Sequence, residues 1–226
     1  MNPQRHHLIY LQPQADFVIT SCHDDLEMIA QEAALWLARG LPFIYAKQFA
    51  RNSTAEADCV ERDLINLGVT LLHGNKKHRV GVQVAPSFVQ KQQPPPQLIA
   101  MQDFFSSYYK IKDLKRITDT CSISDIAVYG SFLFHYLSGS AFVNDTSDLD
   151  LLINYQGYSW TDLHETISAL TKKFNRTIDG EVRFPNFGDI PIKELLDLSA
   201  KKLLCKSKDK VTLLSRTELY EHYPLL

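Results

Sequence analysis

The pair Gly130-Ser131 and the segment 147–153, which contains Asp148 and Asp150, constrain the fold of this chain more than any other feature. The pattern predicts a strand, a Gly-Ser turn into a short helix, a loop, and a second strand with Asp-x-Asp. Side chains of a strand alternate between faces, so the two aspartates share one face, with Cα atoms roughly 6.5–7 Å apart. Carboxylates this close repel one another unless a cation lies between them. Mg²⁺ is the expected cation, because it is bound by one or two carboxylates together with substrate phosphates.

The surroundings of both motifs favour a functional interpretation. Apolar residues at positions 149 and 151–153 indicate a buried strand, where carboxylates are costly without a partner or a metal. The other interpretation is two exposed acids on an edge strand. Gly130 allows close backbone approach, and a helix start favours anions such as phosphates. A Gly-Ser pair alone is more typical of a simple helix cap.

A third acidic residue is expected for phosphoryl chemistry with two metal ions, either as a ligand or as a base. Asp179 and Glu181 share one face of the next predicted strand, residues 178–184, together with Arg183. Either acid could be the third carboxylate, and Asp179 is favoured because it directly follows an apolar residue. The alternative is that Glu181 and Arg183 form an ordinary surface pair.

Phosphate binding also requires cations. Lys206 follows an apolar run and could reach the site, and Arg176 precedes the strand with Asp179. The basic cluster 76–79 lies beside a predicted turn. It is either a solvated hairpin tip or a contact surface for an acidic partner or for substrate phosphates.

Composition excludes several classes of protein. The 226 residues suffice for one large domain or two small ones, and the net charge of −2 argues against a dedicated nucleic-acid binder. No secretory signal is recognisable, and no apolar stretch approaches the ~20 residues that span a bilayer. The four cysteines form no Cys-x-x-Cys pair, which argues against a zinc knuckle and is typical of a reducing cytosol. We therefore expect a cytoplasmic protein without nucleic-acid or membrane partners.

The proline-rich segment 91–97 predicts a domain boundary, because it cannot continue a helix or a central strand. We expect a small α+β domain over residues 1–97 and a second domain, with a mixed sheet of three or four strands flanked by helices, over residues 98–226. The apolar patterns predict helices over residues 24–38, 98–119, 132–137, 161–174 and 192–204, and strands over residues 41–46, 69–72, 78–84, 126–129, 149–154, 178–184 and 211–214. The acidic segment 54–66 also has a helical pattern.

The motif Gly-Ser followed by Ser-Asp-x-Asp-Leu on a strand–helix–strand frame resembles the nucleotidyltransferase superfold of DNA polymerase β type. Nearly the whole chain resembles the malonate decarboxylase holo-acyl carrier protein synthases, also called phosphoribosyl-dephospho-CoA transferases. The stretches that carry this resemblance are 36–44, 77–80, 94–95, 128–131, 147–152, 178–182 and 204–206. Residues 46–47 are Ala-Lys where that family leads us to expect an arginine pair.

The resemblance implies a reaction. The enzyme would transfer the prosthetic group of 2′-(5-triphosphoribosyl)-3′-dephospho-CoA to a serine of the apo acyl carrier protein of malonate decarboxylase, and would release pyrophosphate. Its implied site residues are Asp148 and Asp150 as Mg²⁺ ligands, Asp179 or Glu181 as the third acid (Asp179 also as a metal ligand), Gly130, Ser131 and Ser147 as substrate-binding residues, and Lys206 as the neutralising cation.

Two other functions remain open at this stage. A small-molecule nucleotidyltransferase of aminoglycoside type would use the same chemistry on another acceptor. The basic cluster 76–79 argues mildly against a cationic acceptor. A non-catalytic nucleotidyltransferase-like binding module, for instance an antitoxin-type partner, would not need three acids.

Overall fold

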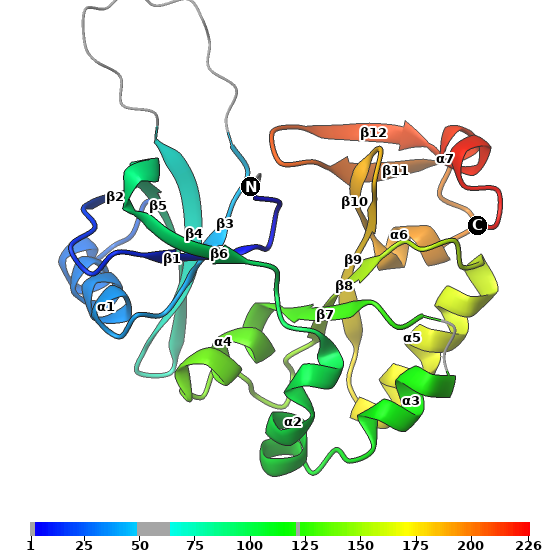
Figure 1. The fold of residues 1–226 in the computed structure, drawn as a ribbon, viewed down its shortest axis with the longest axis horizontal. Helices are drawn as coiled ribbons and strands as arrows, with labels where there is room; N and C mark the ends of the chain where they lie inside the picture. Colours follow the sequence, from blue (N-terminus) through cyan, green and yellow to red (C-terminus); the bar gives the residue numbers. More distant parts are fainter. Residues whose placement is uncertain (1–2, 49–63, 121–122) are drawn as a thin grey trace, which may run out of the picture. The chain divides into compact units, whose positions relative to one another are not determined.

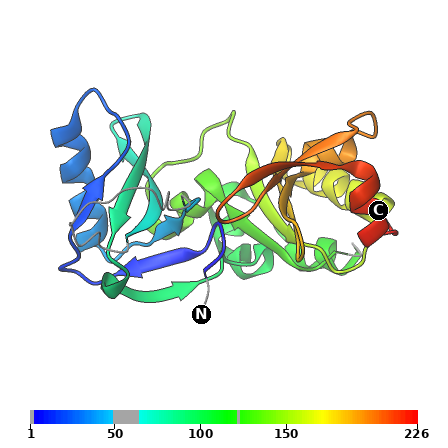
Figure 2. The same ribbon diagram turned by 90° about the horizontal axis from the view of Figure 1, so that it is seen from above.

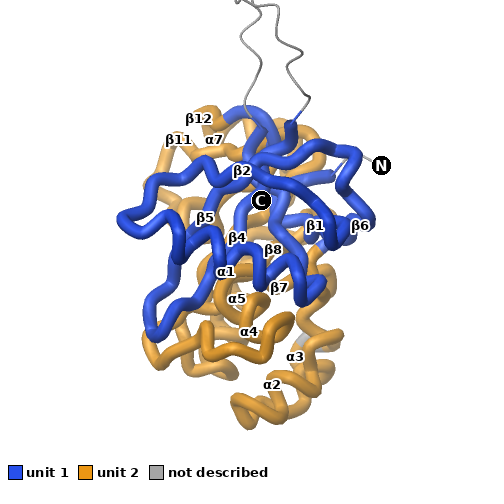
Figure 3. Tube along the Cα trace, turned by 90° about the vertical axis from the view of Figure 1, so that its left-hand side faces the viewer, with its two compact units in different colours: residues 1–94, 208–210 blue, residues 95–207, 211–226 orange. Residues whose placement is uncertain are grey.

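The computed structural model describes residues 3–48, 64–120 and 123–226. The chain divides into two compact units, residues 1–94 with 208–210 and residues 95–207 with 211–226 (Figure 3). The predicted boundary after residue 97 lies close to this division. Residues 54–63 of the predicted acidic helix lie outside the described residues, and positions 65 and 66 begin a strand.

The first unit is built on an antiparallel sheet with the strand order β2-β5-β4-β3-β1-β6 (Figure 1). The strands are β1 (Leu8–Leu11), β2 (Phe17–Ile19), β3 (Phe43–Tyr45), β4 (Ile65–His73), β5 (Lys76–Val84) and β6 (Val89–Gln93). Between β4 and β5 the chain reverses at Gly74-Asn75, as the sequence predicts, with a positive φ of 56° at Gly74. This hairpin places the basic cluster 76–79 at the start of β5.

One helix, α1 (Leu26–Ala38), packs against β4 of this sheet. Asp25 caps it by accepting a hydrogen bond from the Met28 N–H at 2.9 Å, and its apolar stripe of Ile29, Ala33, Trp36 and Leu37 is buried. Gly40, with φ of 66°, follows its end, as expected for a helix stop.

The second unit contains a mixed sheet with the order β12-β11-β10-β9-β8-β7 (Figures 1 and 2). Its strands are β7 (Ile126–Tyr129), β8 (Leu149–Asn154), β9 (Ile178–Phe184), β10 (Gly188–Pro191), β11 (Lys202–Lys206) and β12 (Val211–Ser215). β8 and β9 pair parallel and are connected by α5 (Trp160–Phe174), whereas the other neighbours pair antiparallel.

Helices of the second unit cover one face of this sheet. Besides α5 they are η2 (Leu98–Met101), α2 (Gln102–Tyr109), α3 (Leu114–Thr120), α4 (Gly130–Ser138), α6 (Ile192–Leu196) and α7 (Arg216–His222). Buried side chains of β7, β8 and β9 form one core with apolar residues of the helices, including Phe105, Phe132, Leu163 and Leu170. The predicted α+β class, with a mixed sheet flanked by helices, is confirmed.

Two predicted helices are wrong in extent. The expected helix 192–204 is the five-residue α6 followed by β11, because Asp197 accepts hydrogen bonds from the Ser199 N–H and hydroxyl at 3.0 and 2.6 Å and turns the chain. The expected helix 98–119 is broken into η2, α2 and α3, because Lys110 and Asp113 adopt positive φ angles of 59° and 60°. The sheet therefore has six strands instead of three or four.

Candidate active site

In strand β8 the Asp150 carboxylate lies on the face of the sheet opposite to the hydrophobic core. Leu149, Leu151 and Ile153 are fully buried in that core. Asp150 alternates with them and is half-buried, so it projects from the opposite face of the sheet. Asp148 directly precedes the strand, two positions before Asp150, as the Asp-x-Asp motif predicts.

The parallel pairing of β8 with β9 brings the third acid beside the motif. Asp150 and Asp179 are direct Cα partners in this ladder, where neighbouring strands lie about 4.7–4.9 Å apart. The Leu149 N–H donates to the Thr177 carbonyl at 3.0 Å immediately before this pair. Glu181, the other candidate for the third acid, pairs with Leu152 and therefore lies two residues further along β9 than Asp179.

Gly130 lies directly against the Asp150 side chain. The residue before it, Tyr129, is the Cα partner of Asp150 in the β7–β8 ladder. Gly130 has a positive φ of 66°, and a Cβ atom added to it would overlap Oδ2 of Asp150 and lie 2.6 Å from Cγ. The glycine is thus required twice, for its backbone conformation and for the space that the carboxylate occupies.

Helix α4 begins at this contact, with Gly130 and Ser131 as its first two residues and no capping side chain from Tyr129. The N–H groups in the first turn of a helix have no partner within the helix and favour anions. The structure therefore joins the Gly-Ser turn and the carboxylates into one site.

Glu181 and Lys206 form an ion pair with Oε1 and Nζ 2.7 Å apart. The Glu181 side chain is only 5% exposed, and that of Lys206 is 29% exposed. Lys206 lies at the end of β11 and not after a long helix, as the sequence had suggested. The lysine is therefore in the neighbourhood of the acids, with its ammonium group oriented by Glu181.

Arg183 pairs with Asp189. Its Nε and Nη2 donate to the two carboxylate oxygens of Asp189 at 2.7 and 2.9 Å. Sequence reasoning missed Asp189, which is buried on β10 directly after Gly188. An acid between apolar residues could have signalled it, had the short strand β10 been recognised.

Asp179 is accessible where Glu181 is not, since 41% of its side chain is exposed. Its Oδ1 accepts a hydrogen bond from the Gly180 N–H at 2.9 Å and lies 3.5 Å from Nζ of Lys193. Lys193, on α6, was not predicted from the sequence. An exposed carboxylate beside Asp150 can bind a ligand or accept a proton, whereas the buried Glu181 already has a partner.

Ser147 belongs to a closed turn, residues 144–147, immediately before Asp148. Its hydroxyl donates to the Asn144 side chain at 2.9 Å and accepts from the Asn144 N–H at 3.0 Å. The guanidinium group of Arg176 donates to carbonyl groups of the same turn. The structure gives both residues contacts that hold the loop in front of the acids.

The donor types suit the predicted Mg²⁺, but among the described residues the ligand atoms of the three aspartates do not all lie within 4.8 Å of one another, so the metal site stays a prediction. Asp148, Asp150 and Asp179 could hold the ion with carboxylate oxygens, the ligands that Mg²⁺ prefers. Gly130 supplies the space in which the Asp150 carboxylate sits.

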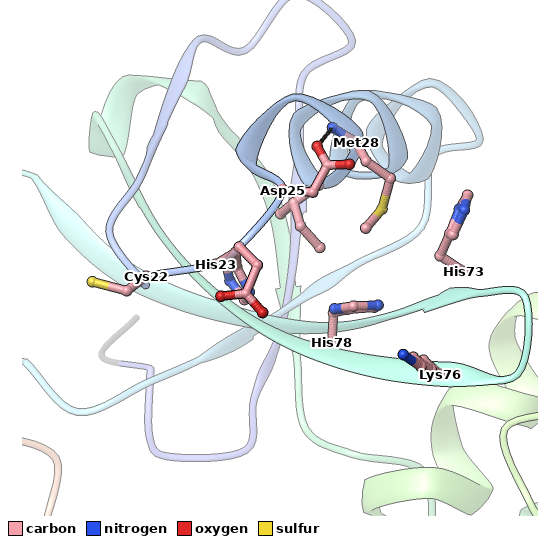
Figure 4. A pocket seen from close by; sticks show the side chains of 9 residues that line it. Cys22, His23, Asp25, Met28, His73, Lys76 and His78 are labelled. Carbon is pink, nitrogen blue, oxygen red and sulfur yellow. Dashed lines mark hydrogen bonds between the residues drawn. The ribbon is translucent and has the colours of Figure 1, made fainter.

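A separate cavity of about 400 Å³ lies in the first unit between α1 and the β4–β5 hairpin (Figure 4). Its lining includes the side chains of His23, His73, Lys76 and His78, and also acidic and apolar residues. The Asp25 carboxylate caps α1 at its edge. The cluster 76–79 is thus partly a cavity wall of mixed charge and not a simple basic patch.

Comparison with known proteins identifies the class. Residues 106–217 match the family model for the C-terminal domain of phosphoribosyl-dephospho-CoA transferase MdcG, and this stretch contains the Gly-Ser turn, all the acids discussed and Lys206. The protein is a transferase.

A curated relative from Bradyrhizobium diazoefficiens, named phosphoribosyl-dephospho-CoA transferase, is 26% identical over 219 residues, which cover 95% of this chain and 91% of the relative. The chain belongs to the phosphoribosyl-dephospho-CoA transferase family. No solved structure matches it. In the described part of the chain, no helix is long and apolar enough to cross a membrane.

Proposed function

We propose that this protein transfers the phosphoribosyl-dephospho-CoA group from 2′-(5-triphosphoribosyl)-3′-dephospho-CoA to a serine of an apo acyl carrier protein, the carrier subunit of malonate decarboxylase. Pyrophosphate is the other product. The family match and the name of the curated relative support the transferred group. We also propose that the reaction takes place in the cytoplasm, because the four scattered cysteines of the sequence form no Cys-x-x-Cys pair and are typical of a reducing compartment.

The observation that carries the proposal is the pairing of Asp150 with Asp179, next to the helix start at Gly130. It supports a site that combines carboxylates with an anion-binding turn, as transfer from a triphosphate requires. We assign Asp148, Asp150 and Asp179 as metal ligands, and Gly130, Ser131 and Ser147 as contacts of the triphosphate.

In the proposed reaction the serine oxygen attacks the α-phosphorus, and the bond from that phosphorus to pyrophosphate breaks. The hydroxyl proton passes to a base, for which we assign the Asp179 oxygen that does not bind the metal, because this side chain is exposed. Lys206 stabilises negative charge on the leaving group, and Glu181 orients its ammonium group. When bound by the three aspartates, Mg²⁺ would neutralise charge on the phosphate oxygens.

The experiment is to incubate the purified protein with Mg²⁺, the triphosphate donor and the apo carrier protein, and to measure the intact mass of the carrier. We expect the carrier to gain one prosthetic group. Asp148→Asn and Asp150→Asn should reduce the rate more than about 100-fold, because even outer-shell residues of metal sites cost 10–100-fold when lost.

Asp145→Asn is the matched control, since it removes an exposed carboxylate from the adjacent loop and should leave the rate unchanged. Turnover at the wild-type rate in Asp150→Asn would refute the assigned role. A parallel incubation with ATP and an aminoglycoside tests the small-molecule alternative, and modification of the aminoglycoside without modification of the carrier would overturn the proposal.

A further inference from the structure

Arg176 connects the segments that carry the acidic site. It follows α5, whose last turn closes at Asn175 with a positive φ of 49°, and it precedes β9 and Asp179. Its Nη1 donates to the carbonyl oxygens of Asn144 and Ser147 at 2.7 and 2.9 Å, with a longer contact of 3.3 Å to that of Asp145.

These carbonyl groups belong to the turn that leads into Asp148. The Asn144 side chain accepts hydrogen bonds from the Thr146 N–H, the Thr146 hydroxyl and the Ser147 hydroxyl, so the turn is internally bonded. Arg176 adds the bonds that fix this turn to the start of β9. These bonds add to the backbone bond from the Leu149 N–H to the Thr177 carbonyl in fixing the position of Asp148 relative to β9.

The same guanidinium group contacts the helix that starts at the Gly-Ser turn. Its Cζ lies 5.5 Å from the ring centroid of Phe132, in the geometry of a cation–π contact. Phe132 is fully buried and is the third residue of α4. Arg176 thus touches both the loop before Asp148 and the helix that begins at Gly130, and it lies three residues before Asp179.

We propose that Arg176 is a positioning residue that holds Asp148, Asp179 and the start of α4 in the arrangement that binds the metal ion. This inference rests on the proposed function for the identity of the ion. The sequence suggested instead that Arg176 faces phosphate directly. The structure favours positioning, because Nη1 is bonded to backbone carbonyl groups of the turn.

The two roles predict opposite changes in metal affinity. Removal of a positive charge near a cation site strengthens cation binding when charge alone matters. Loss of a positioning residue weakens it, by about 10–100-fold for residues that orient metal ligands. The sign of the change therefore separates positioning from direct action of the charge.

The test is a titration of the full-length protein with Mn²⁺, as a probe for Mg²⁺, followed by electron paramagnetic resonance without substrate. We expect Arg176→Gln to bind Mn²⁺ about 10–100-fold more weakly than the wild type. Arg176→Lys should recover part of the loss, because its ammonium group can still donate to the turn. Lys173→Gln, which removes an exposed charge from the last turn of α5, is the matched control and should change the affinity less than twofold.

Amide hydrogen exchange of the turn 144–147 supplies a second measurement. Exchange should accelerate in Arg176→Gln and not in Lys173→Gln, and equal melting temperatures would show that the change is local. Unchanged or tighter Mn²⁺ binding in Arg176→Gln would overturn the inference. If the wild type still modifies the carrier protein, the proposed function would stand. Weaker binding in a protein whose wild type transfers nothing would instead refute the proposed function and leave the positioning role standing.

Discussion

Gly130 and Asp150 share a space that only one side chain can fill. The carboxylate of Asp150 occupies the volume where any residue other than glycine would carry Cβ. A second glycine, Gly139, which follows the same helix, offers a comparison. It follows the end of α4 with a φ of 71°, and nothing lies within 4 Å of an added Cβ. Both positions require a positive φ angle, but only at Gly130 does a neighbouring side chain, that of Asp150, occupy the space of a Cβ atom.

We predict that Gly139→Ala lowers the free energy of unfolding by about 1–2 kcal/mol, the cost of a left-handed conformation for alanine. Gly130→Ala should lose more stability than this, and it should also lose transfer activity, because Asp150 must move. Urea unfolding and the carrier-modification assay measure the two effects. Equal activity in both variants would contradict the role of the contact.

Two ion pairs between strands β9, β10 and β11, Arg183–Asp189 and Lys206–Glu181, are mostly buried. The contact between Lys193 of α6 and Asp179 is much more exposed. Glu181 is almost fully buried against Lys206, whereas Lys193 is 59% exposed beside Asp179. Removal of one partner from a buried pair leaves an uncompensated charge, which costs far more than the loss of a surface pair. These contacts should therefore contribute unequally to stability.

We expect Lys206→Met to lower the free energy of unfolding by about 2–3 kcal/mol, slightly less than for a fully buried pair because the lysine is partly exposed. The control Lys193→Met should cost less than about 1 kcal/mol. Addition of Glu181→Gln to Lys206→Met should recover part of the loss. Denaturant titration measures each value, and equal losses for the two lysines would show that Glu181 does not depend on Lys206.

The packing of α2 against α4 contains a titratable pair. The Tyr109 hydroxyl lies 2.7 Å from Nδ1 of His135, and burial lowers the pKa of His135 while it raises the pKa of Tyr109 to about 12. The Phe104 ring packs edge-on against the imidazole with centroids 5.2 Å apart. A neutral imidazole is therefore preferred in the folded protein.

The stability of this packing should fall as the pH falls below the ordinary histidine pKa of 6.5. The unfolded chain takes up the proton there, whereas the folded chain resists it, so acid favours unfolding. The free energy of unfolding should decrease more between pH 7.5 and 5.5 in the wild type than in His135→Phe. An identical pH dependence in His135→Phe would contradict the prediction.

Across the whole molecule, the sequence predicts what depends on local pattern. The strands 126–129, 149–154 and 178–184 are predicted to the residue, because each is a short, mostly buried run rich in apolar residues. The run Leu203-Leu204-Cys205 fits a helix or a strand equally well, and it was assigned wrongly. Period and length do not separate the two for a short apolar run.

The same division applies to the candidate site. Asp148 and Asp150 could be proposed from strand geometry, which left both Asp179 and Glu181 as candidates for the third acid. The partners of Glu181 and Arg183 could not, because Lys206 and Asp189 become neighbours only through the order β11-β10-β9 of the sheet. The contacts of Arg176 also could not be predicted, because they are made to a loop about 30 residues earlier in the chain, which only the tertiary structure brings beside it.

The contact between Gly130 and Asp150 also has an evolutionary consequence. A related sequence with a larger residue at position 130 needs a smaller residue at position 150 to make room for it. Conversely, once the carboxylate at position 150 is lost, the space around position 130 no longer requires glycine. The two positions should therefore change together among related sequences. Relatives that lack both residues would be those in which the fold persists after catalysis has been lost.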